Sequence, residues 1–499
     1  MNNFDLLLHG LNTALSLNNL LVAGIGAFLG IIVGAMPGIG AVTGVSLLLP
    51  MTFKMNPTTA IIMLAGIYYG NMYGGSYSAI LLNIPGDSPA VMTAMAGYPL
   101  SRQGKGGKAL FTANIASFFG GTIGIIALTV FGPVIANFGL KFGPAEIASL
   151  IFLALTSIGW LLGEDFLKGI IATSLGILLS TIGMDLLSDG SPRFTFGSIN
   201  LLSGISFIPL VIGMFGITQV MDLMAGKNDD SLTDGRRLTI RESILNKKEL
   251  KRISLPILKS SILGNFVGFL PGAGGTTGSF LAYILEKKTG KNKNMDQGAI
   301  EGVAASESAN NASAVGAFAP LLSLGIPGSA TSAVLLGGLM MWGLQPGPLL
   351  FSEQPDFVWG LIGSMYIGNL ICVIAGLAII PFLMSILRIP RGIIAPMIVV
   401  ICIVGSYSVN NSMFDVWFMI GAGAVAYILK KNNYPIAPAL LSFVLATRFE
   451  RSIRQAFSIS RGSALIFIQK PISAVLLALT LLFLCSPLLL KLVHKGSKQ

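Results

Sequence analysis

Residues 30–44 of the chain read GIIVGAMPGIGAVTG, and residues 264–278 read GNFVGFLPGAGGTTG. Eight of the fifteen positions are identical at a constant offset of 234 residues, and both copies contain a Pro-Gly-x-Gly turn. Each turn interrupts an apolar stretch and leaves backbone groups without helical partners. Such irregular backbone at membrane depth is tolerated only where it is buried in protein or lines a wet cavity. Two interrupted segments at matching places in the two halves of a chain indicate the substrate site of a secondary transporter.

The composition is that of a membrane protein. Of the 499 residues, 53% are hydrophobic and 11% are charged, whereas soluble domains carry about 25% charged residues. The net charge of +11 comes mostly from Lys and Arg in short connectors and in the C-terminal tail. The positive-inside rule expects this distribution, so we do not expect nucleic-acid binding. We expect an all-α polytopic integral protein in the lipid bilayer of the bacterial inner membrane.

The chain divides into two halves of the same plan. Each half begins with an apolar region rich in Gly, Pro, Ser, Thr and Asn, termed here a broken-helix module, and continues with about four segments long enough to span a bilayer. Each module contains a Pro-Gly loop (37–40 or 271–274) and then an Ile-Pro-Gly turn (84–86 or 326–328). We expect about 10–12 spans in all. The predicted divisions are the first module 1–98, first scaffold helices 99–225, a linker 226–252, the second module 253–342, and second scaffold helices with the basic tail 343–499.

Charges in the connectors indicate that the two halves are inverted repeats. The connector after the first Ile-Pro-Gly turn is basic (102–108), but the connector after the second (345–356) has no Lys or Arg. The connector after the first Pro-Gly loop has only Lys54, but the connector after the second (287–293) has four lysines. Since basic connectors stay in the cytoplasm, we expect 102–108, 287–293, the linker and the C-terminal tail to be cytoplasmic. The other two connectors are then periplasmic.

The loops and turns are candidates for substrate binding. A Pro-Gly turn before a new helix presents free amides at a positive helix end, which suits a carboxylate, whereas the carbonyls that end the preceding half-helix suit a cation. The alternative interpretation is a tight kink. We assign the upstream glycines, Gly26, Gly30, Gly34, Gly264 and Gly268, to helix packing. The predicted substrate-binding residues are Gly38, Gly40, Thr43, Asn71, Ser76, Gly86, Ser88, Gly272, Gly274, Thr277, Gly328 and Ser329.

Two oxygen-rich stretches, 71–90 and 306–332, suggest a cation site. Their hydroxyl, amide and carboxylate oxygens suit a hard monovalent cation or hydrogen bonds to a substrate. Solvated re-entrant loops or hydrogen bonds between helices are the alternative interpretation. The predicted cation-binding residues are Asp87, Asn83, Ser306, Asn310 and Asn311. Asp87 is the strongest candidate, because an acid within the membrane is costly without a role, and we expect its carboxylate at the start of a half-helix.

Other residues of the modules are less specific. Glu301 lies near the basic connector, so we expect it at the membrane interface, whereas the nearby Glu307 belongs to the oxygen-rich stretch. The run of tyrosines fits a cavity lining or an interfacial aromatic belt equally well; it comprises Tyr68, Tyr69, Tyr73 and Tyr77.

Enzyme chemistry is not expected. The stretch RQGKGGKAL (102–110) lacks the Ser or Thr that follows the lysine of a P-loop. The only histidines are His9 and His494, so no membrane segment supplies a histidine base or metal ligand. We therefore expect no enzyme activity and no cofactor.

Four long motifs, in order, resemble the large membrane subunit of the tripartite tricarboxylate transporter family (the TctA type). They are GAMPGIGAVTG (34–44), YYGNMYGGSYSAILLNIPGDSPAVMTAMAGYPLSRQGKGGKAL (68–110), GFLPGAGGTTGSFLAYILEKK (268–288) and ASESANNASAVGAFAPLLSLGIPGSATSAVLLGGLMMWGLQPGPLLF (305–351). The resemblance covers about residues 15–460. The family's motif positions fall on Pro37-Gly38, Asn71, Pro85-Gly86-Asp87, Pro271-Gly272, Asn310-Asn311 and Pro327-Gly328.

The resemblance implies uptake of citrate or a related carboxylate, with Na⁺ or H⁺ as the coupling ion. It also implies a small four-helix membrane subunit and a periplasmic solute-binding protein as partners. By analogy with other inverted-repeat carriers, we expect elevator-like alternating access, with rocking of the two halves as the alternative motion. A channel or a purely structural assembly subunit is the alternative function.

Overall fold

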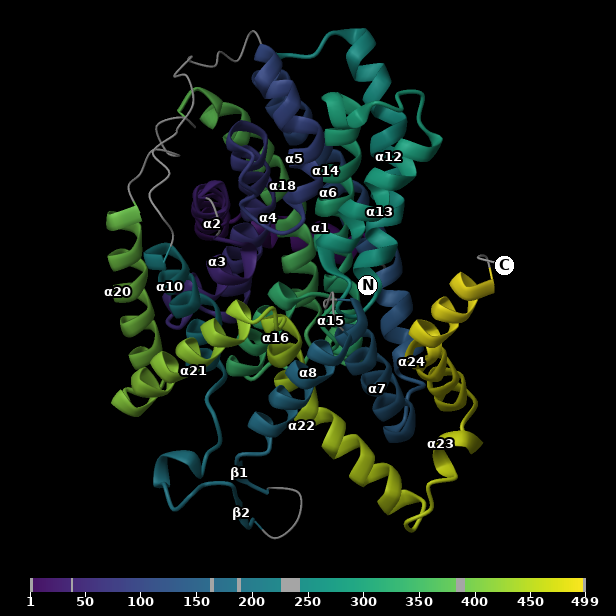
Figure 1. Cartoon of the computed structure of the whole chain (residues 1–499). Coiled ribbons are helices and arrows are strands. Elements are labelled where there is room, and N and C mark those ends of the chain that lie inside the picture. The colour runs from purple at the N-terminus through teal and green to yellow at the C-terminus, as the bar shows by residue number, and fades with distance from the viewer. Residues whose placement is uncertain are drawn as a thin grey trace. The chain divides into compact units, whose positions relative to one another are not determined.

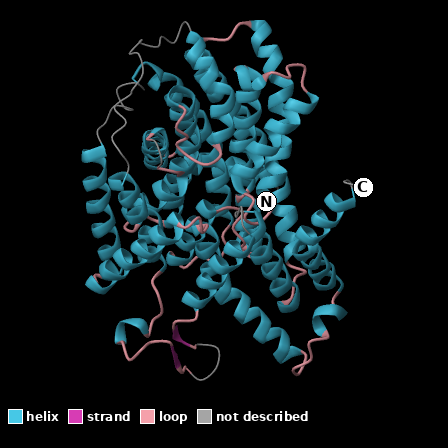
Figure 2. Cartoon of the chain, in the orientation of Figure 1, coloured by secondary structure: helices cyan, strands magenta, loops and turns pink. Residues whose placement is uncertain are grey.

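The computed structural model describes residues 3–36, 39–161, 166–185, 190–225, 243–382 and 391–496. The chain forms two compact units, one made of Met1–Ala136 and Ile208–Tyr427, the other of Asn137–Phe207 and Ile428–Gln499. Helices account for nearly all the regular structure in these ranges, and the strands there form one two-stranded hairpin (Figures 1 and 2). The predicted all-α class is therefore confirmed.

The larger unit holds both broken-helix modules. Its elements in the first half are α1 (Asn3–Leu15), α2 (Leu17–Ala35), α3 (Ala41–Leu48), η1 (Leu49–Thr52), α4 (Pro57–Leu82), α5 (Ala90–Leu100), η2 (Ser101–Lys105), α6 (Gly106–Gly139), α9 (Phe207–Val211), η4 (Ile212–Ile217) and α10 (Thr218–Ala225). Those of the second half are α12 (Lys247–Phe269), α13 (Gly274–Thr289), η5 (Met295–Gln297), α14 (Ile300–Gly316), α15 (Phe318–Leu324), α16 (Ala330–Met341), α17 (Leu350–Glu353), α18 (Pro355–Ile379), η6 (Ile380–Phe382), α20 (Arg391–Asn410) and α21 (Met413–Lys431).

Local sequence sets the ends of the helices at the centre of each module. Helix α4 begins where the Asn56 side chain accepts a hydrogen bond from the Thr59 amide at 2.9 Å, with Pro57 in the first turn. It ends at Asn83, which adopts a left-handed conformation with φ of 58°. Helix α12 begins with a reciprocal capping box between Asn246 and Glu249.

Helices α4 and α14 form the buried centre of the larger unit. All residues of α14 are buried, as is α4 from Thr59 to Leu81. Each packs against the helix that carries the upstream glycines of its module. A Cβ atom at Gly30 of α2 would lie less than 3.0 Å from the Ile67 carbonyl oxygen, and one at Gly264 of α12 would approach the Ala309 oxygen equally closely. The prediction that these glycines form packing faces is confirmed.

The same contacts give the register between the two modules. One turn further on, Gly34 faces the carbonyl oxygen of Asn71, and Gly268 faces that of Ser313. Each residue of α4 therefore matches the residue of α14 that lies 242 positions later. The Ile-Pro-Gly turns keep this register, because a Cβ at Gly86 would meet the Gly34 oxygen and one at Gly328 would meet the Gly268 oxygen.

Helices α6 and α18 make a reciprocal contact beside this centre. A Cβ at Gly121 of α6 would lie 2.9 Å from the Asn369 side-chain oxygen, and Gly376 of α18 faces Asn114 in the same way. Two tyrosines of α4 donate hydrogen bonds to these asparagines, each at 2.7 Å: Tyr73 to Asn369 and Tyr77 to Asn114.

The connectors sort into two groups. The basic connector 102–108 is joined to η5, which directly follows the basic connector 287–293, by a hydrogen bond of 2.7 Å from the Gln103 side chain to the Gln297 carbonyl. At the same end, Lys108 forms a 2.6 Å ion pair with Glu249 at the start of α12. Near the other two connectors, Leu49 of η1 lies 3.1 Å from the Cβ position of Gly338 in α16. In inverted repeats, the connector after the Ile-Pro-Gly turn of one module lies at the same end as the connector after the Pro-Gly loop of the other, and the contacts agree with this arrangement. The side of the membrane on which each group lies stays a prediction.

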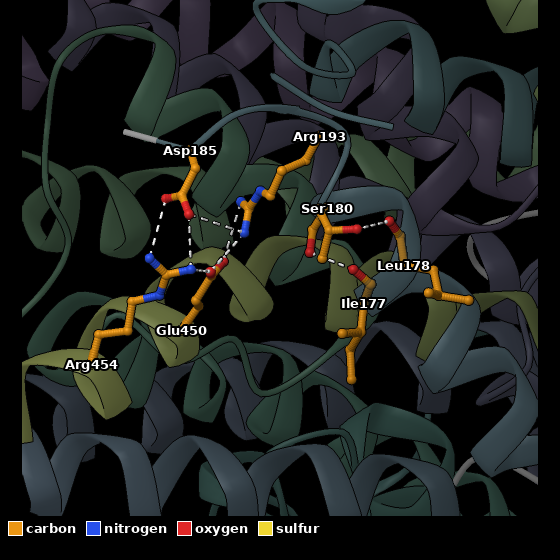
Figure 3. A network of polar contacts seen from close by, with 8 residues as sticks. Ile177, Leu178, Ser180, Asp185, Arg193, Glu450 and Arg454 are labelled. Atoms are coloured by element: carbon orange, nitrogen blue, oxygen red, sulfur yellow. Dashed lines mark hydrogen bonds and ion pairs between the residues drawn. The ribbon is translucent and has the colours of Figure 1, made fainter. Parts of the chain in front are cut away.

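The smaller unit combines helices from both halves: α7 (Pro144–Leu161), α8 (Phe166–Ser180), β1 (Gly183–Met184), β2 (Pro192–Arg193), η3 (Ile199–Leu201), α22 (Ile436–Ile459), α23 (Ile466–Gln469) and α24 (Pro471–Gly496). Helix α22 packs on α7 and α8. A charged cluster fixes the hairpin to α22 (Figure 3). In it, Arg454 lies 2.9 Å from Asp185 and 2.6 Å from Glu450, which accepts a further 2.8 Å contact from Arg193.

Five helices of the described residues are long and apolar enough to cross a membrane: Leu17–Ala35, Ala90–Gly139, Phe207–Ala225, Pro355–Phe382 and Met413–Lys431. Six shorter apolar helices accompany them. The class of polytopic membrane protein is thus confirmed, and the count of about 10–12 spans stays a prediction.

Candidate functional site

In the first module, Asp87 joins the Ile-Pro-Gly turn to the Pro-Gly loop. Its carboxylate accepts hydrogen bonds from the Ala41 amide, at 3.2 Å, and from the Ser88 amide, at 2.7 Å. Ala41 is the first residue of α3, so the acid lies at the start of a half-helix, as predicted. A Cβ atom at Gly40 would lie 2.9 Å from a carboxylate oxygen, so only glycine lets the acid approach this closely.

The turns of the second module come to the same place. The Pro89 ring, directly after the first Ile-Pro-Gly turn, lies 3.2 Å from the Cβ position of Gly275 in the second Pro-Gly loop region. Gly274 faces Ser329, whose hydroxyl caps α16 and lies 3.3 Å from the Tyr68 hydroxyl of α4. Pro37 and Gly38, of the first Pro-Gly loop, lie outside the described residues. Gly40 and Ala41, at the end of the first loop and the start of α3, therefore lie in one group with the three other turns, 84–86, 271–274 and 326–328. This group is termed here the turn cluster.

Buried polar atoms without hydrogen-bond partners surround the turn cluster. Within the described part of the chain, no partner is found for either side-chain atom of Asn71, for the hydroxyls of Ser78 and Ser313, or for the Asn310 oxygen. Asn71 and Ser313 occupy matching positions in the two modules and face Gly44 and Gly278 in the same way, each 3.4 Å from the Cβ position. Because an unpaired buried polar group is costly, these atoms favour a ligand, an ion or water at this place.

A second set of buried polar side chains lies between helices α5, α6 and α14. Glu307 is fully buried, and its carboxylate accepts hydrogen bonds from the hydroxyls of Thr93 and, at 3.3 Å, Ser117. Thr93 also contacts the Ser306 hydroxyl at 2.9 Å, and the Asn311 amide donates to Ser117 at 2.7 Å. We term these five residues the Glu307 cluster. Asn311 further borders a narrow gap between α4, α6, α14 and α18.

The predicted cation-binding residues thus separate into three places. Asp87 is in the turn cluster, and Ser306 and Asn311 are in the Glu307 cluster. Asn310 lies between the two: its side chain is hydrogen-bonded to Glu307, and its unpaired oxygen points to Gly275. Asn83 is exposed at the end of α4. The structure does not place its side chain with the other four.

The predicted substrate-binding residues are likewise divided. Gly40, Gly86, Gly274, Gly328 and Ser329 belong to the turn cluster or pack directly behind it, and Asn71 lies nearby with its side chain unpaired. Gly272, in the second Pro-Gly loop of the turn cluster, has a positive φ of 78°. The remaining residues contribute less. The Ser76 hydroxyl donates to the Tyr73 carbonyl, and Ser88 is exposed and offers its amide to Asp87. Thr43 is buried in α3, and Thr277 is half-buried in α13.

Several features were not expected from the sequence. The tyrosine run is buried within the protein, with at most 4% of any member exposed, so it does not form an interfacial belt. Thr93 and Ser117 were not singled out, and Glu307 was not assigned to the cation site. The signal for Glu307 was present, since it lies between two predicted ligands, Ser306 and Asn310. Glu301 pairs with Arg252 at 2.6 Å, as suits its place beside the basic connector.

Comparisons with known proteins agree with these features. A family model described as the tripartite tricarboxylate transporter TctA family matches residues 20–441. An uncharacterized 52.8 kDa protein in the TAR-I ttuC' 3' region of Agrobacterium vitis is 40% identical over 490 residues, covering 98% of this chain and 97% of that protein. An uncharacterized protein in the TAR-II ttuC' 3' region of the same organism is 44% identical over 219 residues, covering 44% of this chain and 90% of that protein. No solved structure matches. The chain, in which both Pro-Gly loops and both Ile-Pro-Gly turns fall within the matched residues, belongs to the tripartite tricarboxylate transporter TctA family.

Proposed function

We propose that this protein is the membrane carrier for secondary active uptake of a carboxylate, such as citrate, another tricarboxylate or a dicarboxylate. Uptake is driven by a gradient of Na⁺ or H⁺ across the bacterial inner membrane. A periplasmic solute-binding protein delivers the substrate, and a small four-helix membrane subunit completes the assembly. The observation that carries the proposal is the turn cluster, where an acid at a helix start meets the turns of the other module beside unpaired polar atoms.

Asp87 provides a reason for ion dependence at this place. Its charge is held by the Ala41 and Ser88 amides, which are the groups that would otherwise attract a substrate carboxylate. A free Asp87 also repels an anionic substrate. A cation that neutralises Asp87 removes the repulsion and releases the amides, so the substrate binds after the ion. Symport follows from this order of binding.

The proposed motion is elevator-like, with both broken-helix modules moving as one body. Both modules lie in the larger compact unit. The hydrogen bonds from Tyr73 to Asn369 and from Tyr77 to Asn114 join α4 to α18 and α6. These two helices, predicted as scaffold, therefore move with the modules in this proposal.

The test is uptake of labelled citrate and dicarboxylates into proteoliposomes that contain the carrier and both partner subunits, under defined Na⁺ and pH gradients. Asp87→Asn removes the charge but keeps the size of the side chain. We expect it to fold, to assemble with the partners, to lower the rate of uptake by about tenfold or more, and to weaken its ion dependence.

Asp356→Asn serves as the control, because Asp356 is an exposed acid of the same unit at the start of α18. Its uptake should match that of the wild type. Normal uptake by Asp87→Asn with an unchanged ion requirement would show that Asp87 is a helix cap only. A flux that does not saturate with substrate and ignores both gradients would indicate a channel, and the absence of any flux would indicate a structural subunit.

A further inference from the structure

We propose that Glu307 is a second cation-binding group of the carrier, the fixed negative charge that a monovalent cation, H⁺ or Na⁺, neutralises during each transport cycle. This inference rests on the proposed ion-driven uptake. It adds a binding site that is distinct from Asp87 and is built from the Glu307 cluster.

The first argument is the cost of the charge. Glu307 is fully buried, in a helix whose every residue is buried. In the part of the chain that the structure describes, no Lys, Arg or His nitrogen lies within 4.0 Å of its carboxylate. An ionised carboxylate is stable in such surroundings only when a positive charge joins it. A bound cation or proton supplies that charge.

Other acids of the second module show the contrast. Glu301 pairs with Arg252, Glu286 with Lys259 at 2.6 Å, and Asp296 with Lys287. These pairs use the basic residues of α12 and α13, the helices that pack on α14. From α4, the ionisable groups that face Glu307 are the phenols Tyr73 and Tyr77. The protein thus neutralises its other acids here and leaves Glu307 without a fixed partner.

The second argument is the chemistry of the surrounding groups. The hydroxyls of Thr93 and Ser117 contact the carboxylate, and the Ser306 hydroxyl and Asn311 amide extend the group. Hydroxyls can donate to an ionised carboxylate, accept from a protonated one, or coordinate Na⁺. All three helices that contribute therefore offer groups suited to both states of the acid.

The third argument is that the fold does not need an acid here. By the register of the glycine contacts, the residue of α4 that matches Glu307 is Ala65, and those that match Ser306 and Asn311 are Leu64 and Tyr69. All three are buried. The same helix arrangement is therefore built in the first module with no charge at this position, so the acid serves a purpose other than packing.

The position of α5 connects this site to the turn cluster. The helix follows directly on Asp87 and Pro89, which contact Ala41 and Gly275, and one turn later it presents Thr93 to Glu307. A change of charge at Glu307 that shifts Thr93 also shifts the start of α5. Cation binding at Glu307 is in this way coupled to the geometry around the substrate.

The test uses the full assembly in proteoliposomes with Glu307→Gln, which removes the charge and keeps the shape and hydrogen bonding. We expect gradient-driven accumulation of substrate to fall by at least about tenfold, because the step that needs the cation is lost. Exchange of labelled against unlabelled substrate, measured without a gradient, should continue at about the wild-type rate. Separate Na⁺ and pH gradients, applied to the wild type, identify the cation.

Glu353→Gln, at an exposed acid of α17 in the same unit, is the control and should behave as the wild type. Glu307→Asp, which keeps the charge, should retain ion-driven accumulation, and this result supports the proposal even if the Gln variant does not fold. Accumulation by Glu307→Gln with an unchanged ion dependence, or loss of ion dependence in a folded Glu307→Asp, would overturn it. A wild type that accumulates no substrate under either gradient would instead refute the proposed function.

Discussion

The two broken-helix modules share their backbone contacts but differ in the side chains at their centre. In both, a glycine of the first helix faces a carbonyl of the buried helix, and the Ile-Pro-Gly turn packs on the last of these glycines. The buried helix of the first module, however, carries tyrosines, whereas that of the second carries Ser, Glu and Asn. Ser329 stands where the first module has Asp87, and Ala65 stands where the second has Glu307.

This difference shows which part of the repeat serves structure and which serves chemistry. Glycine is fixed at the contacts because any side chain would meet backbone atoms that cannot move aside. Side chains that point to the centre of the unit do not meet such backbone atoms. The two modules therefore differ there, with Asp87 in the first and Glu307 in the second. In the proposed function, an anionic substrate and its cations need different groups on different sides, and two copies of one site would not provide them.

The strongest test of the comparison is whether the two modules cross the membrane in opposite directions. Lys291→Cys and Ser352→Cys place single exposed thiols in the connectors 287–293 and 345–356. We expect an impermeant thiol reagent to label Ser352→Cys from the periplasm and Lys291→Cys only after the membrane is permeabilised, an all-or-none difference. Of the three native cysteines, Cys372 and Cys402 are buried and should react little. The third, Cys485, is replaced by serine in both variants and in the background protein. Labelling of both variants from one side would exclude inversion.

Substitution of the contact glycines tests whether the two interfaces are equivalent. Gly30→Ala and Gly264→Ala each place a Cβ less than 3.0 Å from a carbonyl oxygen of the facing helix. We expect each to cost about 3 kcal/mol or more, because backbone must shift in a packed interior. The measurement is the yield and thermal stability of the protein purified in detergent. Gly24→Ala, on the same helix as Gly30 but with nothing within 4 Å, is the control and should be tolerated. A large effect at only one of the two contact glycines would contradict the shared register.

Much of this symmetric framework was predictable from the sequence. The four-residue spacing of the glycines encodes a packing face, and that prediction needs no knowledge of the partner helix. A half-helix start was predicted for Asp87 from its place after Pro-Gly. That its carboxylate accepts from the first residue of α3, 46 residues earlier, was not predictable from that place. The contact between Gln103 and Gln297 agrees with the grouping of the connectors by charge, while their sides of the membrane stay a prediction.

The asymmetric part was much less accessible. Whether Glu307 has a partner depends on where the side chains of α12 and α13 reach, and the sequence does not reveal that Arg252 and Lys259 are already paired with other acids. The burial of the tyrosine run depends on α6 and α18, which supply its hydrogen-bond acceptors from far along the chain. The hairpin cluster joins Asp185 to Arg454, 269 residues away, and no local pattern predicts such a contact.

The smallest expected effect concerns the two tyrosines that join α4 to the neighbouring helices. Tyr73 and Tyr77 donate to Asn369 and Asn114. Their matching positions in the second module are Val315 in α14 and Ala319 in α15, which carry no hydroxyl. The first module alone therefore supplies both bonds. We expect Tyr73→Phe and Tyr77→Phe each to lower stability by about 1 kcal/mol, since each leaves a buried asparagine oxygen with one donor fewer.

Thermal unfolding of the purified protein measures this effect, and the double variant should lose more stability than either single variant. Because the two tyrosines are one helical turn apart, their losses are not expected to add exactly. Tyr98→Phe is the control, because the Tyr98 hydroxyl makes no hydrogen bond among the described residues, and it should unfold as the wild type does. Each bond joins α4 of the first module to α18 or α6, which were predicted as scaffold helices. In the proposed elevator motion these helices move together with the modules, so the double variant should weaken that rigid connection. Slower uptake in the double variant with unchanged ion dependence would agree with that role. A changed ion dependence would instead place the tyrosines in the cation site and reduce the contrast between the two modules.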